Sequence, residues 1–373
     1  MERGENSVLR VGVVGIGFGQ QAHVPAFRGG KDCEVTALCA SSDERARTVA
    51  DRLGVPKAYG DWRQLIADPD VDLVSVATPP TVQPAIVLGA LARGKPVFCE
   101  KPLALTGEDA RAMLDAARRS GLAHMVDFEF VTIDEWLQAK RIIGQGKLGQ
   151  LRHVSVSWHV EAYAHRMGLR SWKTATAATG GGALASTVSH TFHYLEWLLG
   201  PIRKLSARLF TPPGAGDTLG ETAVVMCLEL DGGASGSVSV CSNAFQGAGH
   251  RLEIYGDSGT LILDNSTSDY VTGFKLFHGT RQTNKLEPVS VGQAGRDVKD
   301  GRVLAVGRLV DRFLGWVRTG VAASPSFEDG YRVQCLMECA RLAHSSGGWV
   351  AVPDRERQAE RRAAGRGQAE ARS

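Results

Sequence analysis

Two side chains that can exchange a proton near neutral pH, those of a lysine and a histidine, lie within distinctive sequence motifs. Lys101 lies in the run CEKPLA, and His190 lies in GGGALASTVSHTFHYLEWLLG, residues 180–200, between Ser186 and His193. Lysine and histidine act as general acids or bases when their pKa lies near the working pH. Burial or a neighbouring positive charge lowers the pKa of a lysine toward that range. Lys101 and His190 are therefore candidates for proton transfer, and the alternatives are a solvated loop charge for Lys101 and a buried core histidine for His190.

The run VGVVGIGFGQQAHVPAF predicts a dinucleotide site. Gly15 permits a tight strand-to-helix turn, and Gly17 lets a pyrophosphate approach a helix N-terminus, where free amides favour anions. Gln20 stands where a third fingerprint glycine is expected, and Gly19 comes one place earlier. The alternative is a tight turn without a ligand. The predicted cofactor-binding residues of this loop are Gly15, Ile16, Gly17, Phe18, Gly19 and Gln20.

The end of the second predicted strand bears on the choice of cofactor. Ser41 and Ser42 stand where an acid would hold the ribose hydroxyls, and Asp43 follows too late and is more simply a helix cap. Without a carboxylate there, Ser41, Ser42 or Arg45 could receive a 2'-phosphate. The sequence therefore favours NADP, with NAD as the alternative.

The elements that must position these residues alternate regularly up to residue 127. Apolar strand-like runs cover 8–15, 33–40, 71–78, 95–100 and 123–130, and helical patterns cover 43–53, 62–67, 81–93 and 107–120. Continuous apolar strands separated by helices predict a doubly wound parallel sheet, a Rossmann α/β domain over 1–127. Loops after such strands face the ligand crevice. The predicted cofactor residues therefore also include Thr78, Pro79, Glu100 and Lys101.

A different pattern begins after residue 127. The segments 153–160, 221–230, 234–243, 250–264 and 274–278 alternate apolar and polar residues between turn signals, which predicts an open, mainly antiparallel sheet. Helices are expected after the glycines at 180–182 and over 327–346. This α+β domain is predicted to extend over 128–353. The tail 354–373 is charged, lacks aromatic residues and is predicted to be disordered.

Composition excludes several classes of function. The net charge of +3 is small and the basic residues are scattered, so no nucleic-acid partner is expected. No apolar run long enough for a membrane span and no signal peptide occur. Seven cysteines without a C-x-x-C pair favour a reduced, cytoplasmic setting. No metal site is expected, because zinc at His190 and His193 would lack a spaced third ligand.

Five motifs together resemble the Gfo/Idh/MocA family of nicotinamide-dependent sugar and cyclitol oxidoreductases. They are GIGFGQQAH at 15–23, TPP at 78–80, CEKPLA at 99–104, GKLGQLRHV at 146–154 and GGGALASTVSH at 180–190. The resemblance implies that Lys101 is the active-site lysine beside the nicotinamide and that His190 is the histidine of the second domain. It also implies dimerisation through the C-terminal sheet, and hence a homodimer or homotetramer.

The chain departs from that family at three positions. Many members carry aspartates where this sequence has Ser186 and His193, and a histidine is common where it has Gln83. No carboxylate is left on the stretch 180–200 near His190 to orient it. Ser186 could hydrogen-bond a substrate, and His193 could carry a proton in place of the missing acid.

The segment WHVEAYAHRMGLRSWKT, residues 158–174, offers polar and aromatic side chains suited to a polyhydroxylated substrate. An ordinary surface loop is the alternative. The predicted substrate-binding residues are Tyr163, Arg166, Trp172, Lys173, Ser186 and His193.

The expected function is hydride transfer between NAD(P) and a secondary alcohol or ketone of a sugar, nucleotide sugar or cyclitol. Three alternatives stay open at this point. They are reduction of a non-sugar substrate such as an imine or a dihydrodiol-type ring, redox-assisted glycoside cleavage, and a non-catalytic NAD(P)-binding regulator.

Overall fold

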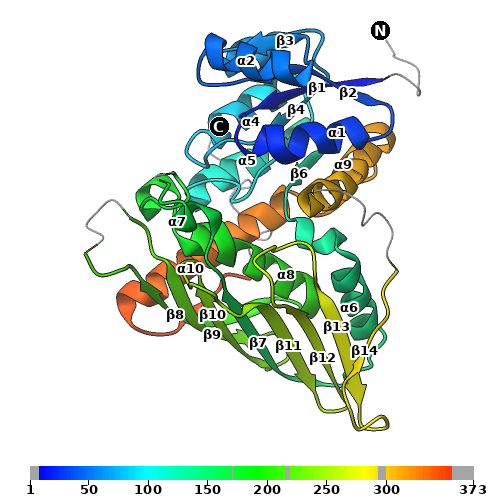
Figure 1. Cartoon of the computed structure of the whole chain (residues 1–373), viewed down its shortest axis with the longest axis vertical. Coiled ribbons are helices and arrows are strands. Elements are labelled where there is room, and N and C mark those ends of the chain that lie inside the picture. The colour runs from blue at the N-terminus through cyan, green and yellow to red at the C-terminus, as the bar shows by residue number, and fades with distance from the viewer. Residues whose placement is uncertain (1–7, 170, 215–218, 293–299, 355–373) are drawn as a thin grey trace, which may run out of the picture.

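Two β-sheets, one parallel and one mainly antiparallel, organise the chain (Figure 1). The computed structural model describes residues 8–169, 171–214, 219–292 and 300–354. The first sheet has the strand order β3-β2-β1-β4-β5-β6, and the second has the order β14-β13-β12-β11-β7-β10-β9-β8-β15. A Rossmann domain followed by an α+β domain with an open sheet is therefore confirmed.

All neighbouring strands of the first sheet run parallel. The strands are β1 (Leu9–Val14), β2 (Cys33–Cys39), β3 (Lys57–Tyr59), β4 (Leu73–Val76), β5 (Val97–Cys99) and β6 (His124–Val126). The helices between them are η1 (Gly19–His23), α1 (Val24–Gly29), α2 (Asp43–Leu53), α3 (Trp62–Ala67), α4 (Gln83–Ala92) and α5 (Gly107–Ser120). The order reverses between β1 and β4, and open parallel sheets bind ligands outside the carboxyl ends of their strands at such a point.

Local signals explain why several helices have the predicted bounds. The side chains of Ser42 and Thr106 accept hydrogen bonds from the first turns of α2 and α5. Gly54 and Gly121 end the same helices in the left-handed conformation, with φ of 63° and 67°. Side-chain caps and terminal glycines satisfy backbone groups that a helix leaves unpaired. These helices are thus determined by residues next to them in sequence.

The second sheet is antiparallel except for the pair β7 and β10. Its strands are β7 (Leu151–His159), β8 (Ile202–Phe210), β9 (Ala223–Leu230), β10 (Ser235–Cys241), β11 (Gly249–Gly256), β12 (Gly259–Asn265), β13 (Lys275–Thr280), β14 (Glu287–Pro288) and β15 (Val350–Ala351). Residues along the central strands alternate between buried and partly exposed, so one face of the sheet forms a core and the other stays open.

The remaining helices lie in the second half of the chain. They are η2 (Glu129–Thr132), α6 (Asp134–Gly144), α7 (Tyr163–Arg166), η3 (Ala177–Thr179), η4 (Leu184–Val188), α8 (Ser189–Leu199), α9 (Gly301–Thr319) and α10 (Phe327–Ser346). The helix predicted over 327–346 is α10, and Ser326 and Asp329 form its capping box. None of the described helices combines the length and apolar character needed to span a bilayer.

The helix α8 differs from the amphipathic helix that its sequence pattern suggests. Leu195 and Phe192 are buried as expected, but His190 and His193 are buried as well, at 4% and 6% exposure. Of the helix residues, Trp197 and Leu199 alone keep intermediate exposure. The helix is therefore covered on nearly every side, because α6, α10 and η2 pack around it.

The helix α9 returns to the first domain and packs beside α1 (Figure 1). Its apolar side chains join Phe27 and Phe98 in one buried core, and the rings of Phe98 and Phe313 lie 5.8 Å apart. The buried residues that α9 contributes are Val306, Leu309, Val310, Phe313 and Leu314. The division of the chain at residue 127 stays a prediction, since this later helix completes the core of the first sheet.

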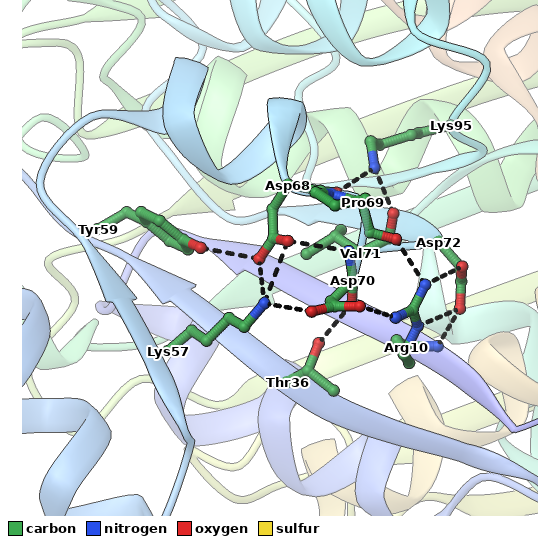
Figure 2. A network of polar contacts seen from close by, with 10 residues as sticks. All are labelled: Arg10, Thr36, Lys57, Tyr59, Asp68, Pro69, Asp70, Val71, Asp72 and Lys95. Atoms are coloured by element: carbon green, nitrogen blue, oxygen red, sulfur yellow. Dashed lines mark hydrogen bonds and ion pairs between the residues drawn. The ribbon is translucent and has the colours of Figure 1, made fainter.

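The amino ends of the parallel strands carry a set of paired charges, here called the amino-end network (Figure 2). Its polar side chains are those of Arg10, Thr36, Lys57, Tyr59, Asp68, Asp70, Asp72 and Lys95. Asp68 accepts hydrogen bonds from Lys57 at 2.9 Å and from Tyr59 at 2.7 Å. The buried Lys95 donates to the carbonyl oxygens of Asp68 and Val71. The buried side chains of Asp68 and Lys95 thus each have hydrogen-bond partners within the protein.

At the end of the described chain, Asp354 accepts a hydrogen bond from Arg203 at 2.6 Å. The rest of the tail that the sequence predicts to be disordered, residues 355–373, lies outside the described residues.

Candidate active site

The glycine loop after β1 has the shape that a dinucleotide requires. Gly15 adopts a φ of 103°, and a Cβ there would lie 2.2 Å from the carbonyl oxygen of Ala77. A Cβ on Gly17 would meet nothing within 4 Å, so open space lies over this residue. A Cβ on Gly19 would lie 3.2 Å from the side chains of Ala77 and Val13. Gly19 therefore provides the close helix-to-sheet packing expected of the third fingerprint glycine.

The other residues predicted to bind the cofactor surround the same switch point. Ile16, Phe18 and Gln20 are partly exposed along the loop, and Pro79 is partly exposed after β4. Thr78 Oγ1 is buried and has no hydrogen-bond partner among the described residues. Open space over Gly17 and the unsatisfied hydroxyl of Thr78, whose side chain lies next to Gly15, are features that fit a bound dinucleotide.

The end of β2 places basic and hydroxyl groups where the ribose would lie. Arg45 Nη1 donates to Ser41 Oγ at 2.8 Å, and Ser42 caps α2. Asp43 accepts from the backbone N–H of Gly60 at 2.6 Å and is occupied by that loop. Arg52 contacts Gln20 of the glycine loop. Cations and hydroxyls, without a free acid, thus border this edge of the site in the described structure.

The carboxyl ends of β4, β5 and β6 hold a buried set of ionisable residues, here called the carboxyl-end cluster. Its members are His23, Glu100, Lys101, Asp127, Glu129 and His190. His23 Nδ1 hydrogen-bonds Ser75 Oγ at 2.7 Å, and His23 Nε2 lies 3.0 Å from Glu100 Oε1 and 3.4 Å from Asp127 Oδ2. These contacts hold the side chains of Glu100 and Asp127 in place near Lys101.

Charge in this cluster is balanced by close partners within a buried site. Burial opposes the charge of His23, but its interactions with the carboxylates of Asp127 and Glu100 outweigh burial and raise its pKa to about 9. Burial, followed by the charge of Glu100, raises the pKa of Asp127 to about 7. His23, Glu100 and Asp127 offer three donor atoms within 4.8 Å of one another. Because the protonated His23 hydrogen-bonds Glu100 and forms an ion pair with Asp127, we interpret the group as a cluster of paired charges.

Lys101 joins the two domains at the centre of the site. Its Nζ donates to the carbonyl oxygen of Ser186 at 2.7 Å. Burial, and then the charge of Lys173, lower the pKa of Lys101 to about 8. The acceptor lies in η4, a π-helical turn in which Ser189 N–H reaches back to Leu184 O. Such turns are frequent at functional sites.

His190 lies within the same buried group. Its ring is 4% exposed, and Nδ1 lies 3.7 Å from Glu129 Oε2. Burial, and then the charges of Lys101 and His193, lower the pKa of His190 well below its ordinary value. The structure therefore brings Lys101 and His190 together, and it supplies a carboxylate for the histidine from η2, outside the stretch 180–200.

Gln83 fills the position where relatives commonly have a histidine. The side chain is fully buried, and its Nε2 donates to the carbonyl oxygens of Glu100 at 3.2 Å, Pro102 at 2.8 Å and Leu103 at 2.9 Å. Gln83 therefore holds the backbone of the loop that carries Lys101.

The predicted substrate residues of the segment 158–174 separate into two groups. Lys173 Nζ lies 5.8 Å from the ring centroid of Phe18, so Lys173 adjoins the glycine loop, and it lies 5.7 Å from the ring centroid of Trp172. Tyr163 and Arg166 pair with each other on α7, where Tyr163 is 63% exposed.

Ser186 and His193 have partners within the protein. Ser186 Oγ donates to the carbonyl oxygen of Gly182 at 2.8 Å. The ring of His193 stacks on Phe128, with centroids 4.2 Å apart and an angle of 9°. His193 also borders a cavity of about 130 Å³, together with Glu196, Trp197, Ser324, Pro325, Asp329 and Val131.

Several residues in or near the cluster were not among the predicted site residues. They are His23, Asp127, Glu129, Tyr270 and Arg302. The rings of Tyr270 and His190 lie 6.3 Å apart, and Arg302 lies 5.5 Å from the ring of Phe18. A signal for two of them was present, since Asp127 and Glu129 interrupt the apolar run AHMVDFEF at the end of the last predicted strand.

Comparisons with known proteins agree with this geometry. The family described as an oxidoreductase family with an NAD-binding Rossmann fold matches residues 9–128, and the GFO/IDH/MocA C-terminal domain matches residues 136–262. An uncharacterized oxidoreductase of Synechocystis sp. is 33% identical over 94% of this chain and 97% of its own length. Inositol 2-dehydrogenase of Burkholderia cenocepacia is 28% identical over 94% of this chain and 98% of its own length.

A solved structure has the same fold over almost the whole chain. Levoglucosan dehydrogenase in complex with NADH and levoglucosan superposes with a TM-score of 0.82, at 26% identity, over 92% of this chain and 99% of that one. The two family matches together cover more than half of the sequence, from the glycine loop to β12. The protein belongs to the Gfo/Idh/MocA family of NAD-binding oxidoreductases.

Proposed function

We propose that the protein transfers hydride between a nicotinamide cofactor and a secondary alcohol, or its ketone, in a sugar, nucleotide sugar or cyclitol. One observation carries this proposal: Lys101 and His190, from separate parts of the chain, meet in a buried cluster at the carboxyl ends of the strands. Inositol 2-dehydrogenase and levoglucosan dehydrogenase, a cyclitol and an anhydrosugar enzyme by name, are similar over nearly the full length.

Lys101 and His190 have different roles toward the substrate hydroxyl group. When bound, the oxidised nicotinamide accepts a hydride from the carbinol carbon. Lys101, with its pKa near 8, can hold the substrate oxygen by donating a hydrogen bond while charged. His190 is neutral at the working pH because burial lowers its pKa, so it can accept the hydroxyl proton.

The cofactor would lie across the switch point. Its pyrophosphate would meet the amides from Gly15 to Gln20, and Thr78, Pro79 and Glu100 would border the nicotinamide side. We infer that NADP is preferred, because Arg45, Ser41 and Ser42 offer a cation and two hydroxyls to a 2'-phosphate. NAD would bind without that contact.

The substrate would enter between the glycine loop and the segment 158–174. Lys173, which adjoins Phe18, and Trp172, which adjoins Lys173, are the proposed contacts for its polar and apolar surfaces. Tyr163 and Arg166 would reach it from α7 only with larger or acidic substrates. Ser186 and His193 are proposed as supports of the site, since each already has a partner within the protein.

The open face of the second sheet is the proposed surface for a homodimer or homotetramer. Alternate residues of its central strands are small, including Ser155, Ser157, Ser237 and Ser239, and they are only partly exposed. A flat face of small side chains allows two sheets to pack closely. Sedimentation of the full chain measures this directly, and a monomer at all concentrations would contradict it.

The function is tested by following cofactor reduction with sugars, nucleotide sugars and cyclitols, using NAD and NADP in parallel. We expect turnover with at least one polyol and a loss of about 10²–10⁴-fold in kcat for K101M and H190Q, because general acid-base groups contribute that much. K275A, which changes an exposed lysine on β13, is the control and should keep full activity.

Three outcomes point elsewhere. Tight cofactor binding without turnover of any alcohol would favour a non-catalytic regulator. Glycoside cleavage without net cofactor reduction would favour redox-assisted hydrolysis. Reduction of imines or dihydrodiol-type rings, with no activity on polyols, would favour a non-sugar reductase. Unaltered turnover in K101M would refute the proposed roles.

A further inference from the structure

Glu129 follows the last strand of the first sheet and faces the histidine whose own helix carries no acid beside it. Its Oε2 lies 3.7 Å from His190 Nδ1, and both side chains are 4% exposed. We propose that Glu129 is the positioning residue for His190: it accepts the Nδ1 proton and thereby holds Nε2 toward the crevice as the atom that exchanges a proton with the substrate. This inference rests on the proposed function.

The roles of the two ring nitrogens follow from their surroundings. His190 Nδ1 is buried and has no hydrogen-bond partner among the described residues, so the exposed 4% of the residue lies elsewhere. In a neutral imidazole one nitrogen donates and the other accepts, and a partner on one fixes the role of the other. The separation of 3.7 Å exceeds a hydrogen bond, and catalytic contacts of this kind shorten when ligands bind.

The turn that carries Glu129 is fixed by α9. Thr132 Oγ1 donates to the carbonyl oxygen of Ala305 at 2.9 Å, and Arg308 donates to the carbonyl oxygen of Thr132 at 2.6 Å. Arg312 donates to the carbonyl oxygen of Val131 at 3.1 Å. A carboxylate can orient another group only if its own position is held, and three bonds from one helix hold this one.

Electrostatics explain why the histidine needs this partner. An imidazolium at His190 would be desolvated and would lie beside the charge of Lys101, so a lone histidine there is a weak base. Burial, and then the charge of Asp127, raise the proton affinity of Glu129, whereas the charge of Lys101 favours its carboxylate form. When Nε2 takes a proton, the Nδ1 proton can move toward Glu129, and the pair gains the proton without leaving a bare imidazolium.

The step balances in the direction of oxidation. The substrate O–H bond breaks, its proton goes to Nε2, and its electron pair forms the C=O bond as the carbinol carbon gives its hydride to the oxidised nicotinamide. Other ionisable groups face this pair from the surrounding elements and share its titration. They are Lys101, Lys173, Glu100, Asp127, His193, His250 and Tyr270.

Two variants of the full chain distinguish the role of Glu129 as a hydrogen-bond acceptor from the role of its negative charge. E129L removes both, whereas E129Q keeps an acceptor and removes only the charge. E135Q, which changes a buried glutamate on α6, is the matched control. The first readout needs no turnover: nitrogen NMR of labelled histidine in the cofactor-free protein, with H190Q to assign the His190 signals. We expect Nδ1 to be protonated in the wild type and in E135Q, and to lose that preference in E129L.

The second readout is kinetic. We expect kcat to fall about 10–100-fold in E129Q, as for other residues that orient a catalytic imidazole, with KM within about twofold. The acidic limb of the pH profile should move to lower pH, because loss of the neighbouring negative charge lowers the pKa of His190. E129Q should cause no further loss in the H190Q background.

The outcomes distinguish this inference from the proposed function. If His190 has the same tautomer and titration in E129L, E129Q and E135Q, Glu129 does not position it, whatever the activity. If no alcohol is turned over by the wild type, the proposed function fails, but the NMR measurement still tests the contact. Equal losses of kcat in E129Q with and without His190 would also overturn the inference.

Discussion

The amino-end network and the carboxyl-end cluster both bury charge beside the strands of the first sheet, but they treat that charge differently. In the amino-end network, burial opposes the charge of Asp68, yet hydrogen bonds from Lys57, Asp70 N–H and Tyr59 lower its pKa to about 2. In the carboxyl-end cluster, burial raises the pKa of Asp127 to about 7. One acid is stabilised in its charged form, and the other is held near the point of protonation.

Hydrogen bonding shows the same contrast. Asp68, Asp72 and Lys95 of the amino-end network each bond at least one named group (Figure 2). At the carboxyl end, Asp127 forms an ion pair with His23 at 3.4 Å, but its oxygens and Nδ1 of His190 lack a hydrogen bond among the described residues. Native proteins rarely leave buried polar groups unsatisfied, and those that remain collect at functional sites. The difference indicates that one end of the sheet contributes stability and the other end contributes chemistry.

A buried lysine, Lys95, and a partly buried one, Lys101, offer the largest test of this comparison. Burial lowers the pKa of both. We expect K101M to reduce kcat about 10²–10⁴-fold. Its effect on the free energy of unfolding should be smaller than that of K95M, because one carbonyl oxygen, that of Ser186, loses its donor. K95M should lower that free energy by about 1–3 kcal/mol, because two carbonyl oxygens lose their donor, and should keep kcat per folded molecule. Urea titration and initial rates measure both. If K95M and K101M reduce kcat equally, the two ends of the sheet do not differ in their contribution to catalysis.

Two buried aspartates give a smaller effect on stability, with opposite signs. D68N should lower the free energy of unfolding by about 2 kcal/mol, since a charge-assisted hydrogen bond is lost. D127N should raise it at pH 8. The raised pKa of Asp127 means that the unfolded chain ionises from about pH 4 while the folded chain keeps its proton to about pH 7, which penalises folding above that window. Denaturation at pH 5 and pH 8 measures the change, and destabilisation by D127N at pH 8 would contradict it.

Acid should weaken the wild-type fold through the amino-end network. Because the pKa of Asp68 is depressed in the folded state, its contribution is fully present above about pH 4 and is lost as the pH falls toward 2. D68N should therefore flatten the dependence of unfolding free energy on pH between 4 and 2. If the unfolding free energy of D68N depends on pH as steeply as that of the wild type, other acids are responsible for the loss of stability in acid.

The smallest effect is expected at the exposed rim of the carboxyl end. R45A should raise KM for NADP about tenfold, since one charge-assisted hydrogen bond contributes about 1.5 kcal/mol, and should leave KM for NAD unchanged. The ratio of the two KM values is the measurement. An equal change for both cofactors would show that Arg45 does not contact the 2'-phosphate, and R47A on the same helix is the control.

The sequence predicted most of the first domain because its signals are local. The helix over 107–120 is bounded by Thr106 and Gly121, and strands such as β1 and β4 are continuous apolar runs. The helix α9 was not among the predicted elements, and its place on the first sheet depends on contacts with residues almost 300 positions earlier. No local pattern specifies such a contact.

The candidate site was predicted in part, for the same reason. Lys101 and the glycine loop lie in motifs whose position after a strand determines where they face. Glu129 was missed because it stands on η2, while His190 stands on α8, and only the packed structure brings the two within 3.7 Å. Glu129 lies about 60 residues before His190 in the chain, outside the stretch 180–200, so no local pattern links the two residues.

The packing of α9 against the first sheet has a consequence during synthesis. Five of its apolar residues complete a core that also contains residues of β1, β2, β4, β5, β6, α1 and α2. A growing chain that has emerged only as far as β6 therefore exposes part of that apolar surface. We expect the ribosome-bound intermediate to need a chaperone, or the interior of the exit tunnel, until residue 319 is free.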